Sequence, residues 1–185
     1  KLFTLLALTI TFSMNAQMSD YSSGTAATGT NAVAMGKSTT ASGSYSTATG
    51  YQTTASHTAS TAMGQSTTAS AAFTTAIGYN ATASGDYSTA MGRYTTATGI
   101  TSTAMGWSTT ASDYSSTVIG QYNSSGSSAT SASSFSTSAP AFVIGNGTDS
   151  SSKSDAFKVM FNGDTTVSND LTVSGDVVVS SDARL

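Results

Sequence analysis

The sequence contains no cysteine, no glutamate, one proline and one histidine, and charged residues make up only 8% of its 185 positions. Without cysteine no disulfide can crosslink the chain, so its stability must come from backbone pairing and packing. With no carboxylate pair in register and no Cys/His set, we expect neither catalysis nor a metal or other cofactor. The mild net charge of −3 includes no basic patch, which argues against nucleic-acid binding.

What the sequence does contain is a fourteen-residue repeat that runs seven times, from residue 23 to residue 120. A second glycine often falls seven residues before the end of a unit, at Gly29, Gly43, Gly85 and Gly99. Such self-similarity at a fixed period is the sequence sign of a repeat architecture. Each unit ends in glycine, at Gly36, Gly50, Gly64, Gly78, Gly92, Gly106 and Gly120.

The composition of the unit favours strand over helix. Ser, Thr and Gly dominate, and all three are neutral to poor in helix interiors. Each half of a unit is typical of a short strand followed by a turn, with glycine supplying corner angles that a side chain would resist. The sequence therefore predicts an all-β fold, a parallel β-solenoid or β-roll with fourteen-residue coils over 23–120.

Strand alternation divides each unit into inward and outward positions. In the second half, Ser46, Ala48 and Gly50 share one face, and Thr39, Ala41 and Gly43 repeat this pattern in the first half. We expect these small residues to fill the coil interior. The predicted interior alanines are Ala27, Ala41, Ala48, Ala55, Ala62, Ala69, Ala76, Ala83, Ala90, Ala97, Ala104 and Ala111.

The opposite face of the second half carries a column of large apolar residues. Stacked at about 4.8 Å, these side chains form a continuous outward ridge, whose burial stabilises by roughly 1.5–3 kcal/mol per residue. We therefore expect the ridge to pack against copies of the same chain in a bundle of parallel rods. The alternative is that these residues fill the coil and alanine faces outward. The column comprises Met35, Met63, Ile77, Met91, Met105 and Ile119, with Thr49 in the second unit.

The repeated S-x-A-x-G pattern, as in SYSTATG, SGDYSTAMG and NAVAMG, resembles the YadA-like head of trimeric autotransporter adhesins. The resemblance covers about half of the chain in seven units of constant register. It implies a left-handed parallel β-roll and a homotrimer in which the apolar ridge lies at the trimer interface.

Residues 1–16 are typical of a secretory signal peptide. Lys1 precedes an apolar run that is too short to span a bilayer, and Ala16 stands at a plausible cleavage point. Residues 17–22 then form a lead-in to the repeats. The alternative is a buried N-terminal strand. Cleavage after Ala16 would mean that the mature protein is exported, with no membrane insertion in the remaining chain.

The repeat decays after Gly120. Residues 121–140 are rich in Ser and Thr and predict a degenerate coil or a linker, which ends at Pro140, the single proline. Residues 141–185 predict a β-rich tail. In it, AFKVMF and DTTVS flank Asn162-Gly163, which is a hairpin signal, and two further short strands are expected around Ser174-Gly175.

The end of the chain resembles the segment that leads into the intramolecular chaperone of phage tailspikes. Ser181, Asp182, Ala183 and Arg184 match the opening of that chaperone. The resemblance implies that a further C-terminal domain follows and that Ser181 lies at an autoprocessing junction, whose lysine partner is absent. The alternative is an ordinary polar terminus.

The first position of each unit varies most and carries aromatic and basic residues beside a turn. Tyr51, Tyr79, Arg93 and Trp107 are candidate contacts for a protein or glycan ligand, or they pack between subunits. Tyr45, Phe73 and Tyr87 raise the same two alternatives on the opposite edge. The single histidine, His57, occupies a turn position where most units have glycine, and we assign it no catalytic role.

These features predict an exported, trimeric surface fibre with an adhesin-like head that is associated with the outer membrane and attaches by multivalent contact. Two alternatives remain. Thr40, Ser42 and their counterparts form a hydroxyl array like the ice-binding faces of β-solenoid antifreeze proteins, although serine lacks the methyl group usual there. A phage-type fibre shaft is the other alternative, and the predicted signal peptide argues against it.

Overall fold

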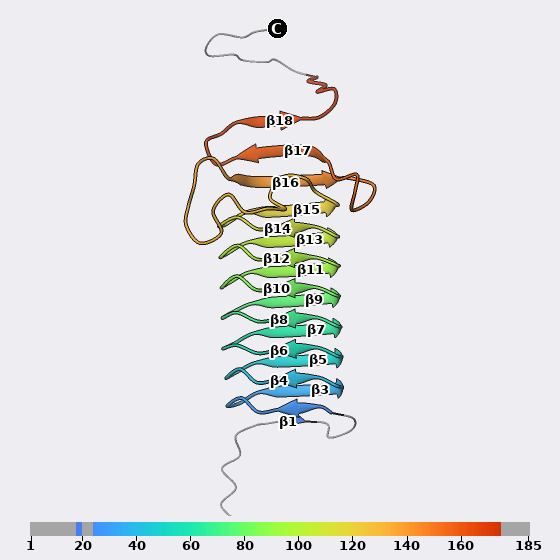
Figure 1. The fold of residues 1–185 in the computed structure, drawn as a ribbon, viewed down its shortest axis with the longest axis vertical. Helices are drawn as coiled ribbons and strands as arrows, with labels where there is room; N and C mark the ends of the chain where they lie inside the picture. The colour runs from blue at the N-terminus through green and yellow to red at the C-terminus, as the bar shows by residue number, and fades with distance from the viewer. Residues whose placement is uncertain (1–17, 20–23, 175–185) are drawn as a thin grey trace, which may run out of the picture.

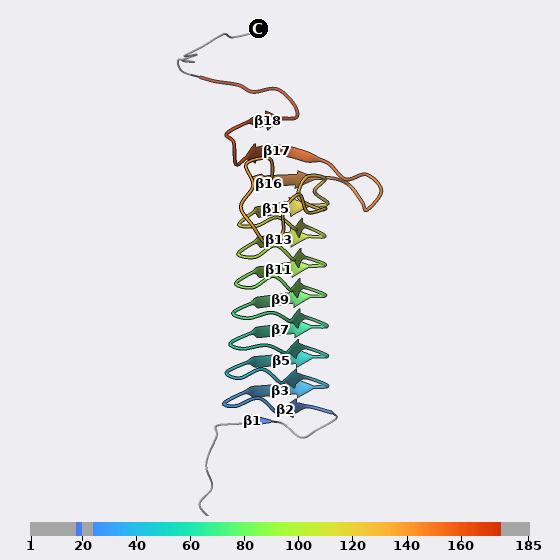
Figure 2. The same cartoon turned by 60° about the vertical axis from the view of Figure 1, so that its left-hand side comes forward.

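The computed structural model describes residues 18–19 and 24–174, and this part of the chain contains strands and turns without a helix. The chain winds into a narrow upright rod in which two parallel sheets lie back to back (Figures 1 and 2). Each coil contributes one longer strand to the first sheet and one two-residue strand to the second. The predicted parallel β-solenoid with fourteen-residue coils is therefore confirmed.

The first sheet, which we call the long sheet, stacks the second half of every repeat. From β3 to β15 its neighbours pair in parallel at a constant offset of fourteen residues, as in Met91 with Met105 and Gly92 with Gly106. Each five-residue strand ends on the first residue of the next unit. The strands are β1 (Met18–Ser19), β3 (Val33–Lys37), β5 (Thr47–Tyr51), β7 (Thr61–Gln65), β9 (Thr75–Tyr79), β11 (Thr89–Arg93), β13 (Thr103–Trp107) and β15 (Thr117–Gln121).

The second sheet, the short sheet, stacks the Thr-Ala pairs of the first halves with the same offset, as in Thr82 with Thr96. Its strands are β2 (Ala26–Ala27), β4 (Thr40–Ala41), β6 (Thr54–Ala55), β8 (Thr68–Ala69), β10 (Thr82–Ala83), β12 (Thr96–Ala97) and β14 (Thr110–Ala111). The hydrophobic pattern alone sets this register, because a slip of one residue would turn alanine outward.

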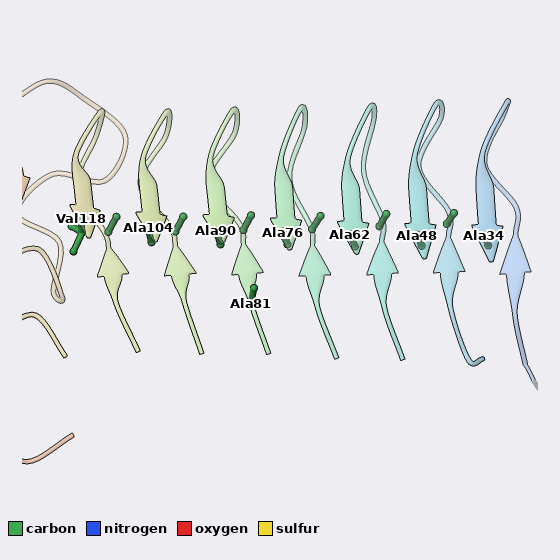
Figure 3. Close-up of a cluster of buried hydrophobic side chains, with 14 of the residues drawn as sticks. Ala34, Ala48, Ala62, Ala76, Ala81, Ala90, Ala104 and Val118 are labelled. Carbon is green, nitrogen blue, oxygen red and sulfur yellow. The ribbon is translucent and has the colours of Figure 1, made fainter. Parts of the chain in front are cut away.

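The core is a column of alanine side chains between the two sheets, seen end to end in Figure 3. The predicted interior alanines are fully buried from Ala41 to Ala111, and Val118 closes the column. Ala27 is the exception: it is only partly buried, because it belongs to β2 at the open edge of the short sheet. The lumen therefore has room for small side chains only.

Hydroxyl groups share this lumen. Ser or Thr precedes most interior alanines by two residues and is buried there, whereas alanine takes this place before Ala34 and Ala83. Some of these hydroxyls are bonded: that of Thr74 donates to the carbonyl oxygen of Ala71 at 2.8 Å. Others form a column without a hydrogen-bond partner, which comprises Thr39, Thr53, Thr67, Thr95 and Thr109.

The corners require left-handed backbone at regular intervals. From Asn31 to Tyr122, a non-glycine residue with φ between 43° and 61° recurs every seven residues. The glycines that end the units also have positive φ, and a Cβ atom on Gly92 would lie 2.1 Å from the carbonyl oxygen of Gly106. Only glycine fits there, as the sequence predicted.

The earlier glycine of each unit has a different role from the one predicted. Gly43 does not have a positive φ. Glycine is favoured there by close approach instead, since an added Cβ atom would lie 1.9 Å from the carbonyl oxygen of His57 in the next coil. His57 itself occupies this position in the third unit, where its N–H donates to the hydroxyl of Ser60 at 3.2 Å.

Parallel stacking extends past the predicted end of the repeats. β16 (Pro140–Asn146) pairs in parallel with β15, and Ile144 aligns with Ile119. The sequence Phe-Val-Ile-Gly-Asn thus forms the long strand of an eighth coil, which the sequence analysis assigned to a separate tail. Residues 124–139 replace the short strand of that coil and pack over the end of the short sheet, where the N–H of Ser112 donates to Gly126.

A side chain terminates the short sheet. Asn123 is buried, its Oδ1 accepts from the N–H of Thr110 at 2.8 Å, and its Nδ2 donates to the carbonyl oxygen of Thr110 at 2.9 Å. These two bonds replace those that a further strand would make to β14. The edge of the sheet is thereby closed, which limits pairing with another chain.

Two antiparallel strands complete the long sheet. β17 (Asp155–Met160) pairs with β16, and β18 (Thr165–Val167) pairs with β17 across the Asn162-Gly163 turn, so the predicted hairpin is confirmed. No strand is found at 169–174, where Leu171 is exposed, so that part of the two further predicted strands is wrong. The predicted signal peptide and Ser181 lie outside the described residues.

Candidate functional site

The outer face of the long sheet carries the apolar column predicted from the sequence. Met35, Met63, Met91 and Met105 are 36–42% exposed, and Ile77 and Ile119 are half-buried by their neighbours in the column. None of these side chains lies in the lumen, which alanine fills. The alternative packing, with methionine inside and alanine outside, is therefore wrong.

The same column continues into the last strands of the sheet. Ile144 aligns with Ile119, and Phe157 of β17 aligns with Ile144. Phe142 packs edge-on against Phe157, with ring centroids 6.2 Å apart. We call the whole column, from Met35 to Phe157, the apolar ridge. The strands that carry the ridge follow one another in the long sheet from β3 to β17 (Figure 1).

Beside the ridge, at the ends of the long strands, lies the column of variable residues. Arg93 aligns with Tyr79 on one side and Trp107 on the other. Its guanidinium carbon lies 5.9 Å from the ring centroid of Tyr79, 5.3 Å from that of Trp107 and 5.1 Å from that of Tyr94. These distances are within the range of cation–π attraction. We call Tyr79, Arg93, Tyr94 and Trp107 the Arg93 cluster.

The rings of the cluster also contact each other and their neighbours. Tyr79 and Tyr94 pack edge to face at 5.2 Å, and Trp107 contacts Tyr122 at 5.2 Å. The hydrogen bond between the Tyr79 and Tyr94 side chains raises the pKa of Tyr79 and lowers that of Tyr94, and Arg93 contributes to the lower value.

Of the four candidate ligand contacts, three come together and one does not. Tyr51 lies in the same column, but Gln65 separates it from Tyr79, and its cationic neighbour is Lys37 at 5.8 Å. Sequence reasoning missed Tyr94 and Tyr122. Both follow the strand end in a left-handed conformation, so strand alternation does not indicate where their side chains point. The sequence signal that could have found both residues is an aromatic side chain beside a turn.

The opposite edge of the rod has its own aromatic pair. Phe73 and Tyr87 stack in parallel with centroids 5.1 Å apart, and both have positive φ. Tyr45 lies on the same edge and is 63% exposed. Large exposed side chains at strained backbone positions favour a role in contact with a ligand or with another subunit.

The hydroxyl array on the short sheet is in register but incomplete. Thr54, Thr68 and Thr82 align and are half-buried, whereas Ser70 beside them is exposed. The array ends at Ser112, which is buried under the inserted residues 124–139.

His57 and a polar pocket near β17 are further polar features of the described residues. His57 is exposed, and its Nδ1 accepts from the N–H of Thr58. Over residues 18–19 and 24–174, no three His or Asp side chains gather as metal ligands. A polar pocket of about 350 Å³ lies near β17 and is lined by Ser124, Ser125, Lys153, Ser154, Asp155, Lys158, Thr166 and Ser168. The Asp155 carboxylate there accepts from the N–H groups of Ser124 and Ser125.

The same part of the chain contains no helix of the length and apolarity that membrane crossing requires.

A search of curated proteins with the whole chain found no match. A scan of family models matched the YadA head domain repeat at residues 27–53, 41–67, 55–81, 69–95 and 97–123, which together cover just over half of the chain. The stacked coils, their alanine interior and this match agree, and the chain belongs to the YadA head family of non-enzymatic adhesins.

Proposed function

We propose that this protein is the head of an exported, homotrimeric surface fibre that attaches its cell to a host or surface ligand by multivalent contact. The observation that carries the proposal is the apolar ridge, which leaves four methionines 36–42% exposed along a narrow rod. Contiguous exposed apolar surface of this kind marks an interaction site. A parallel copy presents the same column at the same spacing.

Membership of the YadA head family supports the number of copies and the location. Three parallel rods that meet along their ridges would bury the methionines at a common axis. The variable columns at the rod edges would remain at the rim of the interface. Export to the cell surface, in association with the outer membrane, rests on the predicted signal peptide and on the family.

Attachment by such a head needs no tight single contact. Three identical copies bring three equivalent sites to one surface, and linkage raises the overall avidity by about 10²–10⁴-fold when the geometry lets the sites engage together. The mechanism is mechanical display combined with repeated weak binding.

The test measures the mass of the assembled protein and its adhesion to a surface. Light scattering of the purified protein is expected to give three times the chain mass, and beads coated with it are expected to adhere to a ligand-bearing surface. A stable single-chain particle would overturn the assembly. A trimer that adheres to no cell or matrix surface would overturn the attachment role.

A further inference from the structure

The Arg93 cluster contains a positive charge that no acidic group of the described chain neutralises. Asp86 and Asp113 are the acidic residues of the repeats. The Asp86 carboxylate accepts from the N–H of Ala72, and Asp113 is buried and accepts from Thr130 and Ser131. From Lys37 to Gln121, the strand-end column of Arg93 holds only neutral or basic residues, although the chain as a whole is acidic.

The guanidinium is held in place by aromatic faces. The guanidinium carbon lies 5.1–5.9 Å from the ring centroids of Tyr79, Tyr94 and Trp107. Stacked arginine keeps N–H donors at the edge of its plane, in the fork that matches the two oxygens of a carboxylate or sulfate. Because Tyr79, Arg93 and Trp107 stand on paired strands, little ordering entropy is lost when a ligand binds.

The size and surface of the cluster fit a small ligand. Three strands at a spacing of about 4.8 Å span roughly 10 Å, which is the length of one or two sugar rings. A stable protein partner needs about 800 Å² on each side, far more than this cluster offers. Tyr79, Tyr94 and Trp107 are 37–41% exposed, so parts of their rings remain open to stack on the apolar face of a sugar.

We propose that the Arg93 cluster is a binding site for an anionic glycan, with Arg93 pairing the acidic group and the rings stacking on the sugar that carries it. This inference rests on the proposed attachment function and names its ligand class. The acidic group is a carboxylate or a sulfate.

The experiment measures binding of three probes to the intact protein by calorimetry at low salt: sialyllactose, a 6-sulfated lactosamine and lactose. Arg93→Gln is expected to weaken binding of the anionic probes by about 10- to 100-fold, because a hydrogen-bonded charge is lost. Arg93→Lys keeps the charge without the fork and should lie in between. Lys37→Gln is the matched control, since it removes the same charge from an exposed position of the same column outside the cluster.

Three outcomes overturn the inference: equal affinity for lactose and both anionic probes, equal losses in Lys37→Gln and Arg93→Gln, or no binding of any probe. A preference for either anionic probe that Arg93→Gln abolishes supports it and identifies the acid. Circular dichroism and light scattering of each variant separate a loss of binding from a loss of fold or assembly. If beads coated with the wild-type protein adhere but the protein binds no glycan probe, the attachment function is supported and the Arg93 cluster is not a glycan site.

Discussion

At the scale of single residues, the lumen contains hydroxyl groups of two kinds. Thr67 is buried and its Oγ1 makes no hydrogen bond, whereas Thr74 is equally buried and donates to Ala71 at 2.8 Å. A buried polar atom without a partner costs about 1–3 kcal/mol, and a bonded one does not. The two threonines therefore should respond in opposite ways to the same substitution.

Thr67→Val is expected to raise the free energy of unfolding by about 1 kcal/mol, because the shape is kept and an unbonded hydroxyl is removed. Thr74→Val is expected to lower it by about 1–2 kcal/mol, since the Ala71 carbonyl oxygen loses its donor. Denaturant midpoints at one fixed protein concentration provide the comparison. A loss of stability in both variants would contradict this account of the lumen.

Glycine at the end of a unit has a positive φ and no room for a Cβ atom. Gly163 has only the positive φ, so comparing the two positions separates the two effects. Gly92→Ala combines a φ of +131° with a Cβ atom 2.1 Å from a backbone oxygen. Gly163→Ala, in the terminal hairpin, has a φ of +94° and nothing within 4 Å of the new atom. We expect about 1–3 kcal/mol of destabilisation from backbone strain at Gly163 and clearly more at Gly92. Thermal melting of the two variants measures the difference, and equal melting temperatures would argue against close coil contact.

At the scale of elements, the end of the short sheet depends on one side chain. Asn123→Ala removes both hydrogen bonds to Thr110 and leaves its N–H and carbonyl groups unpaired. We expect a loss of about 1–3 kcal/mol and faster hydrogen exchange at the Thr110 amide. Ser128→Ala, an exposed change in the same insertion, is the control. Unchanged protection of Thr110 would show that Asn123 does not close the sheet.

The loop between β16 and β17 carries a pH-sensitive turn. The Asp149 carboxylate accepts from the N–H groups of Ser151 and Ser152, and these bonds hold its pKa below the ordinary value of 3.8. Because the folded pKa is lowered, this stabilisation is present above the unfolded pKa and is lost as the pH falls through the folded one. NMR titration of the Ser151 amide should show this transition below pH 3.8, and Asp149→Asn should abolish it. A transition above pH 3.8 would mean that folding raises the pKa of Asp149 instead of lowering it.

At the scale of the whole molecule, the proposed trimer depends on burial of the apolar ridge. Met91→Asp would place one carboxylate per copy at the common axis, where burying unpaired charge costs several kcal/mol per group. We expect single chains in light scattering, with far-ultraviolet circular dichroism unchanged. Thr98→Asp adds the same charge at an exposed position on the short-sheet side, and this variant should remain trimeric. An intact trimer with Met91→Asp would remove the ridge from the interface.

The repeat was sufficient to predict the rod, its register and its alanine interior, because each position recurs often enough to reveal its environment. The eighth coil was missed because Phe142 to Asn146 keep only the pattern of Thr117 to Gln121, after an insertion that breaks the period. The role of Asn123 has no sequence signal, since its side chain replaces the backbone groups with which a further strand would bond Thr110. Tyr94 joins the Arg93 cluster through a left-handed corner that strand alternation does not describe.

The constant fourteen-residue offset also affects how the rod changes over generations. Neighbouring units are near-identical, as in Thr-Ala-Met-Gly at 89–92 and 103–106, so unequal recombination between them gains or drops whole rungs. Each rung adds or removes about 4.8 Å while the stacking above and below is restored. The length of the rod is thus a heritable property that can be adjusted in equal steps.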